Sequence, residues 1–345
     1  MRAILVIAGV IGLASAAAIA GVRTSARDDH AAVRRLPSVS AQASALGGAA
    51  DDAEEEPPAA EVTTSATSAG SDGGAPLREG SPGCGSPVAS GDSLERLDTD
   101  QGVRSYRRHL PEAYREGIPT ALVLNFHGFG RSAAEQERYS QLVPVSDRAG
   151  FILVTPEGSG SPAGWDIPGV YAENGYDDVG FVLVLLGQLE ADLCIDPVRV
   201  FATGLSNGAE MASLMACRQP ALFAAIAPVA GVIYSDCDEG AVPVIAFHGT
   251  LDYNIPFEFA PPSLASWAAH NGCEPGMHDR QVSDNVTAWE FAGCGGADVA
   301  LYAVDGGGHT WPGAEDNAGG AGPTTHEIDA SELIWAFFDA HPKAR

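Results

Sequence analysis

The sequence predicts an α/β fold with a mostly parallel, doubly wound sheet in a single domain. Short apolar runs typical of buried strands, such as residues 120–126, alternate with longer segments of helical periodicity, such as residues 179–193. The chain has 345 residues, of which 45% are hydrophobic, so it can bury the core of one domain of about 250 residues. In such sheets the functional residues lie at the carboxyl ends of the strands.

Strand and helix segments follow one another in the order that this fold requires. Seven segments have the composition of strands: residues 103–110, 120–126, 151–155, 198–202, 224–229, 242–247 and 299–304. Three segments have apolar residues at helical spacing: residues 179–193, 207–217 and 332–340. We therefore expect the folded domain to cover residues 96–345.

The first 95 residues do not follow this alternation. Residues 3–22 form an uncharged run between Arg2 and Arg23, which predicts a signal peptide or a membrane anchor over residues 1–23. Residues 24–95 are rich in Ala, Ser, Gly, Pro and acids and contain few large apolar side chains, so we expect a disordered linker. The protein is therefore expected to be secreted, with a membrane-anchored, periplasmic or surface-facing protein as the alternative.

The chain is strongly acidic, with 45 acidic and 19 basic residues and a formal net charge of −26. A charge of this sign repels nucleic acids and anionic lipids. We therefore expect no nucleic-acid partner, and contact with a membrane only through the N-terminal segment.

Six cysteines behind an export signal predict disulfides, because their number is even and exported proteins mature in an oxidising compartment. None of them forms a CxxC pair, so a zinc site is not expected. The preferred pair is Cys273–Cys294, which would close a segment late in the chain. Cys217–Cys237 comes second, and Cys84–Cys194 follows by elimination.

Ser206 lies in the pattern Gly204-Leu205-Ser206-Asn207-Gly208, between a predicted strand and a predicted helix. A nucleophile elbow requires this context, because the serine must sit on a sharp, strained turn that exposes its hydroxyl. Gly204 and Gly208 remove side chains that would collide across the turn. We therefore expect Ser206 to be a catalytic nucleophile rather than part of an ordinary glycine-rich turn.

A nucleophilic serine needs a base, and chain order selects one among nine histidines. In hydrolases of this type the order is Ser, acid, His, with the histidine late in the chain. His309 follows the strand at residues 299–304 in a glycine-rich loop, and we expect it to be the general base. His127 and His248 each precede a glycine at a strand end, where we expect structural roles.

The acid that orients the histidine should leave a strand between Ser206 and His309. The segment VPVIAFHGTLD is an apolar strand followed by a turn that ends on Asp252. We expect the Asp252 carboxylate to hold the histidine in the correct tautomer. Asp305 and Glu258 are the alternatives, each better explained as a loop charge.

The oxyanion hole should combine two backbone N–H groups, one directly after the nucleophile and one from a loop after an earlier strand. These criteria select Asn207 and Phe129, with Gly128 and Gly130 as the neighbours that could replace Phe129. For substrate contacts we expect Trp165 and Trp311, with packing inside a loop as the other interpretation of each.

Several matching segments in order give the chain a family resemblance from about Cys84 to His341. They include LNFHGFG, RVFATGLSNGAEM, FHGTLDYNIP and GGGHTWPG. The chain resembles polyhydroxybutyrate depolymerase-like proteins and the feruloyl and acetylxylan esterases of carbohydrate esterase family 1, which have an α/β-hydrolase fold. The resemblance implies the same triad and oxyanion residues. This chain departs from the family at Ala209-Glu210, where a second glycine is common after the elbow.

The resemblance implies a serine carboxylic ester hydrolase that works through an acyl-enzyme, without a metal or an organic cofactor. Feruloyl or related plant cell-wall esters are the preferred substrates, and polyhydroxybutyrate oligomers and acetylxylan are the alternatives. A serine peptidase and a non-catalytic binding protein are the rival interpretations from other classes.

Overall fold

The structure is a computed structural model that describes residues 79–170, 175–235, 237–315 and 320–344. The expected signal peptide or anchor at residues 1–23, and the expected linker up to residue 78, lie outside the described residues. Within the described part of the chain, no helix is both long enough and apolar enough to span a bilayer.

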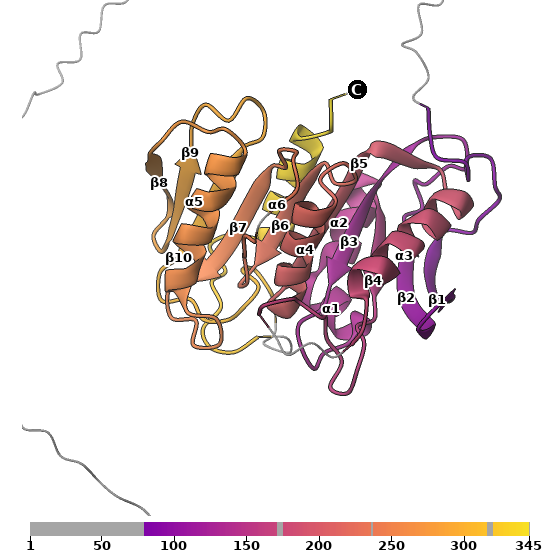
Figure 1. Cartoon of the computed structure of the whole chain (residues 1–345), viewed down its shortest axis with the longest axis horizontal. Helices are drawn as coiled ribbons and strands as arrows, with labels where there is room; N and C mark the ends of the chain where they lie inside the picture. The colour runs from indigo at the N-terminus through magenta and orange to yellow at the C-terminus, as the bar shows by residue number, and fades with distance from the viewer. Residues whose placement is uncertain (1–78, 171–174, 236, 316–319, 345) are drawn as a thin grey trace, which may run out of the picture. The chain divides into compact units, whose positions relative to one another are not determined.

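A ten-stranded sheet runs through the centre of the domain (Figure 1), in the order β1-β2-β4-β3-β5-β6-β7-β10-β9-β8. The six strands from β4 to β10 in this order are parallel to their neighbours, and the pairs at the two edges are antiparallel. The strands in chain order are Gly91–Thr99 (β1), Gly102–Leu110 (β2), Thr120–Phe126 (β3), Ile152–Pro156 (β4), Ile195–Leu205 (β5), Ala225–Val229 (β6), Val244–Gly249 (β7), Met277–Ser283 (β8), Val286–Phe291 (β9) and Val299–Val304 (β10).

Helices cover both faces of the sheet, which makes the fold doubly wound as expected. In Figure 1, α3, α4 and α5 lie in front of the strands, and α2 and α6 lie behind them. The core accordingly has two parts, one holding Met211 and Trp267 and the other Leu142 and Phe338. The helices are Ala133–Ser140 (α1), Leu142–Ala149 (α2), Asp178–Asp192 (α3), Asn207–Arg218 (α4), Ala260–His270 (α5) and Ala330–Ala340 (α6), with a short 3₁₀ turn at Phe257–Phe259 (η1).

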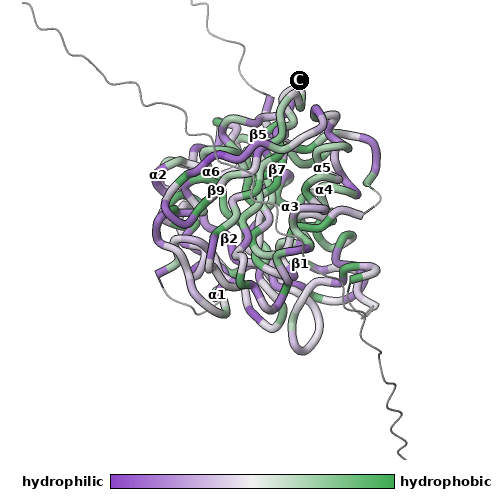
Figure 2. The backbone as a smooth tube through the Cα atoms, turned by 90° about the vertical axis from the view of Figure 1, so that its left-hand side faces the viewer, coloured by the Kyte–Doolittle hydropathy of each residue, from purple (hydrophilic) through white to green (hydrophobic). Residues whose placement is uncertain are grey.

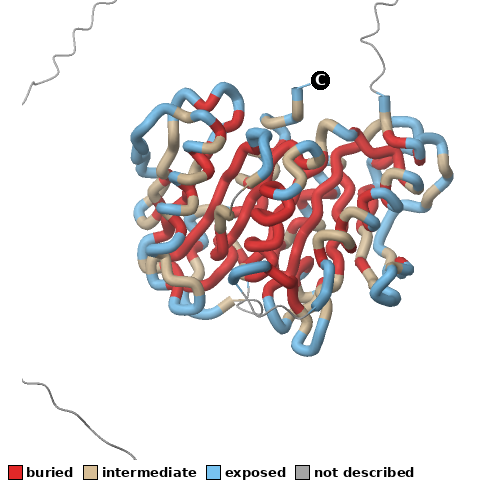
Figure 3. Tube along the Cα trace, viewed as in Figure 1, coloured by how far each residue is buried: buried red, intermediate tan, exposed pale blue. Residues whose placement is uncertain are grey.

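The central strand β3 is continuously apolar because helices cover it on both sides. Leu122 and Leu124 pack into the part of the core that contains α4 and α5, whereas Val123 packs into the part that contains α6. Figure 2 shows hydrophobic segments in the middle of the molecule around β7, and Figure 3 shows the central strands buried along their length.

The folded domain begins earlier than expected, so the predicted linker boundary at residue 95 is wrong. Residues 91–99 form β1, which pairs with β2 along its full length. Only Leu97 of this edge strand is buried, so β1 lacks the apolar alternation that would have revealed it. Further upstream, Ser81 N–H donates to Ile195 O at 2.9 Å, which attaches this segment to the start of β5.

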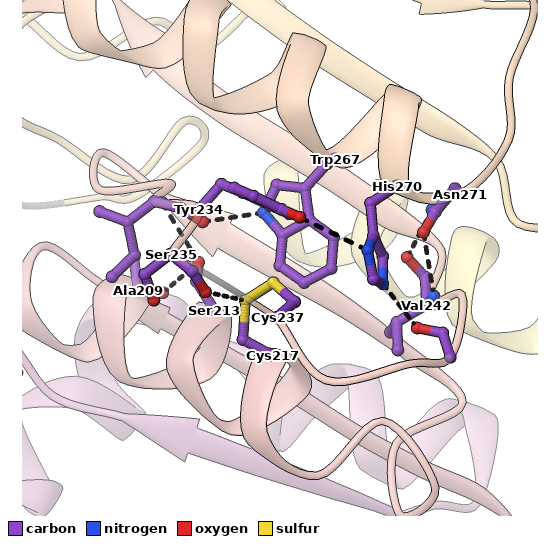
Figure 4. Close-up of a disulfide and its surroundings, with 12 residues drawn as sticks. Ala209, Ser213, Cys217, Tyr234, Ser235, Cys237, Val242, Trp267, His270 and Asn271 are labelled. Carbon is purple, nitrogen blue, oxygen red and sulfur yellow. Dashed lines mark hydrogen bonds between the residues drawn. A yellow bond between two sulfur atoms is a disulfide. The ribbon is translucent and has the colours of Figure 1, made fainter.

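Three disulfides join the pairs that were preferred from the sequence. They are Cys84–Cys194, Cys217–Cys237 and Cys273–Cys294, with Cα–Cα distances of 4.0, 4.2 and 3.9 Å. Cys217–Cys237, drawn in Figure 4, ties the end of α4 to the loop that follows β6.

Candidate active site

Ser206 occupies a strained turn between β5 and α4. Its backbone has φ 58° and ψ −125°, a conformation that costs energy for any residue with a side chain. A Cβ atom on Gly204 would lie 2.5 Å from Gly208 O, and one on Gly208 would lie 2.2 Å from Phe126 O. The chain therefore needs glycine at both positions to make this turn, as the five-residue pattern predicted.

The elbow presents a half-buried serine at the amino end of a helix. Ser206 N–H donates to Val229 O at 2.9 Å, which fixes the turn to β6. Ser206 is the N-cap residue of α4, but its side chain makes no capping hydrogen bond. The hydroxyl therefore remains available for chemistry. The first N–H groups of a helix have no partner within the helix and favour negative charge nearby.

Asp252 and His309 are hydrogen-bonded to each other. His309 Nδ1 lies 2.7 Å from Asp252 Oδ2, and both residues are 4% exposed. Asp252 follows β7 and His309 follows β10, and these strands are parallel neighbours, so both loops leave the same edge of the sheet. The N–H groups of Asn254 and Ile255 each donate to Asp252 Oδ1 at 2.9 Å, which fixes the carboxylate.

The surroundings of Asp252 keep it ionised. Burial alone would raise its pKa, but hydrogen bonds from His248 and His309, together with the Ile255 N–H, hold the pKa well below its usual range. A carboxylate next to Nδ1 favours the tautomer that carries a proton there. The other ring nitrogen, Nε2, is then left as the basic atom of His309.

Ser206 also lies at the carboxyl ends of the parallel strands, because it follows β5, which is separated from β7 only by β6. Within the described residues its hydroxyl makes no hydrogen bond, whereas the sequence predicted a partner in His309. Bonds of this kind are often long or poorly aligned in active sites without substrate. The structure thus brings Asp252 and His309 into contact and places Ser206 near them without a direct bond.

The loop that carries Phe129 lies against the elbow. A Cβ atom on Gly128 would be 3.5 Å from Ser206 Cβ and 3.4 Å from Leu205 O. Phe129 is exposed, and its ring lies over Gly164, where a Cβ atom would be 2.7 Å from Phe129 Cδ2. Asn207 is the first residue of α4, where its N–H is one of those without a partner inside the helix.

His127 holds this loop from beneath. It is fully buried, its Nε2 accepts a bond from Gly158 N–H at 2.8 Å, and its Nδ1 lies 2.8 Å from Gly128 O. Burial lowers the pKa of His127, so the neutral imidazole with its proton on Nδ1 satisfies both contacts. His127 therefore sets the path of the backbone that leads to Phe129.

Trp165 and Trp311 are both buried, and their predicted contacts with a substrate remain a prediction. They are 2% and 1% exposed, and their indole N–H groups donate to His127 O at 2.8 Å and to Ser331 Oγ at 3.0 Å. Both rings are thus packed inside the domain, which agrees with the alternative interpretation that they serve packing. Trp165 still supports the site, because its backbone N–H and C=O bind the side-chain amide of Asn207 at 2.7 and 3.0 Å.

His248 contacts the acid, a position that the sequence did not reveal. Its Nε2 lies 3.2 Å from Asp252 Oδ2 and 2.8 Å from Ile255 O. Its Nδ1 is buried without a hydrogen-bond partner among the described residues. The signal was present in the segment FHGTLD, where the two residues are four apart. We expected a structural role for His248 because it precedes a glycine at a strand end. The structure gives it a more specific one, which is contact with the Asp252 carboxylate.

Comparison with known proteins gives the chain a family. The family model described as "Esterase PHB depolymerase" matches residues 104–249. A probable feruloyl esterase C of Aspergillus clavatus is 30% identical over 236 residues, in an alignment that covers 66% of this chain and 82% of the relative. The putative esterase NocK of Nocardia uniformis is 34% identical over 272 residues, covering 66% and 76% of the two chains.

The chain belongs to the polyhydroxybutyrate depolymerase-like and feruloyl esterase family. Solved structures agree on the fold of this esterase. An acetyl xylan esterase from Aspergillus awamori superimposes with a TM-score of 0.56 and 17% identity, covering 72% of this chain and 99% of the other. An S-formylglutathione hydrolase from Agrobacterium tumefaciens does so with a TM-score of 0.51 and 12% identity, covering 74% and 98%. The fold is that of an α/β-hydrolase, and the chain is a carboxylic ester hydrolase.

Proposed function

We propose that this esterase is a serine hydrolase with Ser206 as nucleophile, His309 as general base and Asp252 as the acid that orients the base. The observation that carries the proposal is the 2.7 Å bond between His309 Nδ1 and Asp252 Oδ2, made at the sheet edge where Ser206 sits on its strained turn. A buried carboxylate–imidazole pair beside a nucleophile elbow is the arrangement that activates a serine.

In the proposed reaction, Ser206 Oγ attacks the ester carbonyl carbon while His309 Nε2 takes the hydroxyl proton. The tetrahedral oxyanion is held by the backbone N–H groups of Phe129 and Asn207. The C–O bond to the alcohol breaks, the alcohol leaves with the proton from His309, and an acyl-enzyme remains. His309 then takes a proton from water, the hydroxide attacks the acyl carbon, and Ser206 regains its proton as the acid departs.

For the substrate we propose feruloyl or related plant cell-wall esters. Support comes from a relative named "Probable feruloyl esterase C" in Aspergillus niger and one named "Feruloyl esterase C" in Emericella nidulans, at 29% and 28% identity over 83% of each relative. The description of the family model makes oligomers of polyhydroxybutyrate the second candidate. We further propose that the protein is exported and works outside the cell, in keeping with its three disulfides.

The test is a set of hydrolysis assays on the full chain and on Ser206→Ala. We expect p-nitrophenyl acetate and methyl ferulate to be cleaved and peptide anilides to be left intact. We expect Ser206→Ala to lower kcat by roughly 10⁴-fold or more, because loss of the nucleophile disables the whole triad. Retained activity in this variant would refute the serine mechanism, and cleavage of anilides alone would refute the class of reaction.

A further inference from the structure

The loop that follows β4 is closed by its own backbone. It consists of residues 157–166, and we call it the 157–166 loop. Ser159 N–H donates to Gly164 O at 2.8 Å, and Gly164 N–H donates to Ser159 O at 2.9 Å. A Cβ atom on Gly158 would lie 2.6 Å from Gly164 O, so the two arms of the loop are in direct contact. Because the arms are joined in this way, contacts made by either arm act on the loop as a whole.

The same loop binds the segment that carries Phe129, the first proposed donor to the oxyanion. Ala163 O accepts the Gly130 N–H at 2.6 Å, and His127 Nε2 accepts the Gly158 N–H at 2.8 Å. Gly130 therefore uses its N–H inside the protein and does not replace Phe129 as a donor. The bonds at His127 and Gly130 flank Phe129, so the loop fixes the backbone on both sides of it.

The 157–166 loop also binds Asn207, the second proposed donor. Trp165 N–H donates to Asn207 Oδ1 at 2.7 Å, and Asn207 Nδ2 donates to Trp165 O at 3.0 Å. A Cβ atom on Gly164 would lie 3.1 Å from Asn207 Oδ1, so the loop packs directly on this side chain. Asn207 is the first residue of α4, and the two bonds to its amide tie the start of the helix to the loop. One loop thus sets the spacing between the two proposed donors.

Both arms of the 157–166 loop are held by one carboxylate, that of Asp178, the first residue of α3. Ser159 Oγ in the first arm lies 3.1 Å from each oxygen of this carboxylate. Asp166 N–H, at the end of the second arm, donates to Asp178 Oδ2 at 2.8 Å. The Asp178 side chain is completely buried. Because it binds both arms of a closed loop, this carboxylate fixes where the loop lies as well as its shape.

Arg104 on β2 supplies the opposite charge. Its Nη1 lies 2.9 Å from Asp178 Oδ1, and its Nη2 donates to Glu157 O at 2.9 Å. Its Cζ lies 3.8 Å from the centre of the Phe181 ring, which holds the guanidinium against α3. A buried carboxylate is costly unless a charged partner and hydrogen bonds surround it, and Asp178 has both. Removal of the carboxylate would therefore leave Arg104 unpaired and release both arms of the loop.

The neighbouring Asp177 serves as the cap of α3, so Asp178 is not needed for that purpose. Asp177 is the N-cap residue, and its side chain accepts the Gly180 N–H at 2.7 Å. Asp177 is exposed, whereas Asp178 is buried with its carboxylate bound to the 157–166 loop. Two adjacent acids thus have different roles: the first starts the helix, and the second holds the loop that contacts both proposed donors.

We propose that Asp178 is a positioning residue of the oxyanion hole, which acts through the 157–166 loop on the backbone at Phe129 and Asn207. The proposal rests on the proposed function, which makes these two N–H groups the donors. Such donors stabilise a tetrahedral oxyanion because they are already in place when the charge develops, and a misplacement of about 1 Å can cost about 10²-fold in rate. Asp178 therefore affects the transition state more than the binding of the substrate.

The test uses Asp178→Asn in the full chain. This change keeps the size of the side chain, but it removes the charge and turns an amide NH₂ toward Arg104 or toward the Asp166 N–H. We measure kcat and KM with p-nitrophenyl acetate. We expect kcat to fall about tenfold or more, up to the roughly 10²-fold cost of losing one oxyanion donor, and KM to stay within about twofold of the wild type.

The inhibition constant Ki of a phenylalkyl trifluoromethyl ketone gives a second measurement, which depends directly on the oxyanion hole. Ser206 Oγ bonds to the carbonyl carbon of the ketone, the C=O electron pair moves to the oxygen, and His309 takes the hydroxyl proton. The product is a hemiketal whose negatively charged oxygen occupies the hole. In Asp178→Asn, Ki should rise by the factor by which kcat/KM falls, because both depend on the same two donors.

Two further variants separate positioning from stability. Asp177→Ala is the matched control, because it removes the capping bond at the same end of α3, so it should lower Tm and leave kcat, KM and Ki at the wild-type values. Ser159→Ala is milder, since it removes the contact of one arm and keeps the pair of Asp178 with Arg104. Its Ki should rise about threefold or more. Titration of the nucleophile with paraoxon counts the active molecules, so unfolded protein does not lower the measured kcat.

The possible failures can be distinguished. If Asp178→Asn keeps the wild-type kcat and Ki, whatever its Tm or KM, Asp178 only stabilises the fold and this inference is wrong, while the serine mechanism stands. If Asp178→Asn does not fold, Ser159→Ala decides: a raised Ki supports the inference, and an unchanged Ki overturns it. If Ser206→Ala retains esterase activity, the proposed function fails and this inference fails with it.

Discussion

At the scale of single residues, two imidazoles share one carboxylate. His248 Nε2 lies near Asp252 Oδ2 and Ile255 O, and because both are acceptors, this nitrogen carries the proton. His309 binds the same carboxylate oxygen from the loop after β10. His248 therefore acts through Asp252, as a positioning residue that keeps the acid ionised and fixed for His309.

We expect His248→Leu to lower kcat about tenfold or more, because a hydrogen bond to a charged group is lost. In His248→Gln the side-chain amide reaches the place of Nε2 and can donate to the same acceptors, so this variant should keep most of the activity. Rates on p-nitrophenyl acetate, with Tm measured in parallel, separate an effect on the site from unfolding. If the Leu variant matches the wild type in kcat, His248 does not position Asp252.

The sequence supported predictions for residues that follow strands better than for residues within loops. Ser206, Asp252 and His309 each come directly after a buried run, so the sheet itself dictates which edge they occupy. Trp165 and Trp311 lie in loops, where the direction of a ring depends on packing partners such as Ser331 that are distant in sequence. No local pattern reports such partners, so the sequence alone does not show whether these rings face a substrate or pack inside the domain.

At the scale of elements, the parallel centre of the sheet was predictable and its margins were not. The central strands are buried on both faces and are therefore continuously apolar, as β3 illustrates. The edge strands β1 and β8 are largely exposed, and their sequences GDSLERLDT and MHDRQVS carry no apolar run. Helix α5 begins Ala-Pro-Pro, and prolines in a first turn also resemble a helix-breaking loop.

The elbow depends on the close approach of α4 to β3, which Gly208 permits. We expect Gly208→Ala to lower the free energy of unfolding by about 1–3 kcal/mol, because the new methyl group would collide with Phe126 O. Gly187→Ala in α3 is the matched control, since a Cβ atom there meets no atom within 4 Å. That change should be neutral or stabilising by up to about 1 kcal/mol, since alanine favours helix more than glycine. Urea unfolding of both variants tests the difference, and equal stabilities would contradict the crowded elbow.

At the scale of the whole molecule, the buried Asp252 carboxylate links the active site to acid stability. Its folded pKa is held below that of a free carboxyl group, which is about 4. The group therefore stabilises the fold fully above about pH 4, and this contribution is lost as the pH falls below that value. We expect the free energy of unfolding to decrease more steeply below about pH 4 in the wild type than in Asp252→Asn. Parallel curves from denaturant titrations at several pH values would contradict this link.

Both ends of the described chain meet at the far side of the sheet from the elbow. Ser81 N–H donates to Ile195 O, Cys84 is bonded to Cys194, and Lys343 N–H donates to Val198 O at 2.9 Å. All three attachments are at the start of β5, the strand whose other end carries Ser206. A support or fusion partner joined at residue 79 or at residue 344 would therefore attach at the opposite end of β5 from Ser206 and leave the carboxyl ends of the strands uncovered.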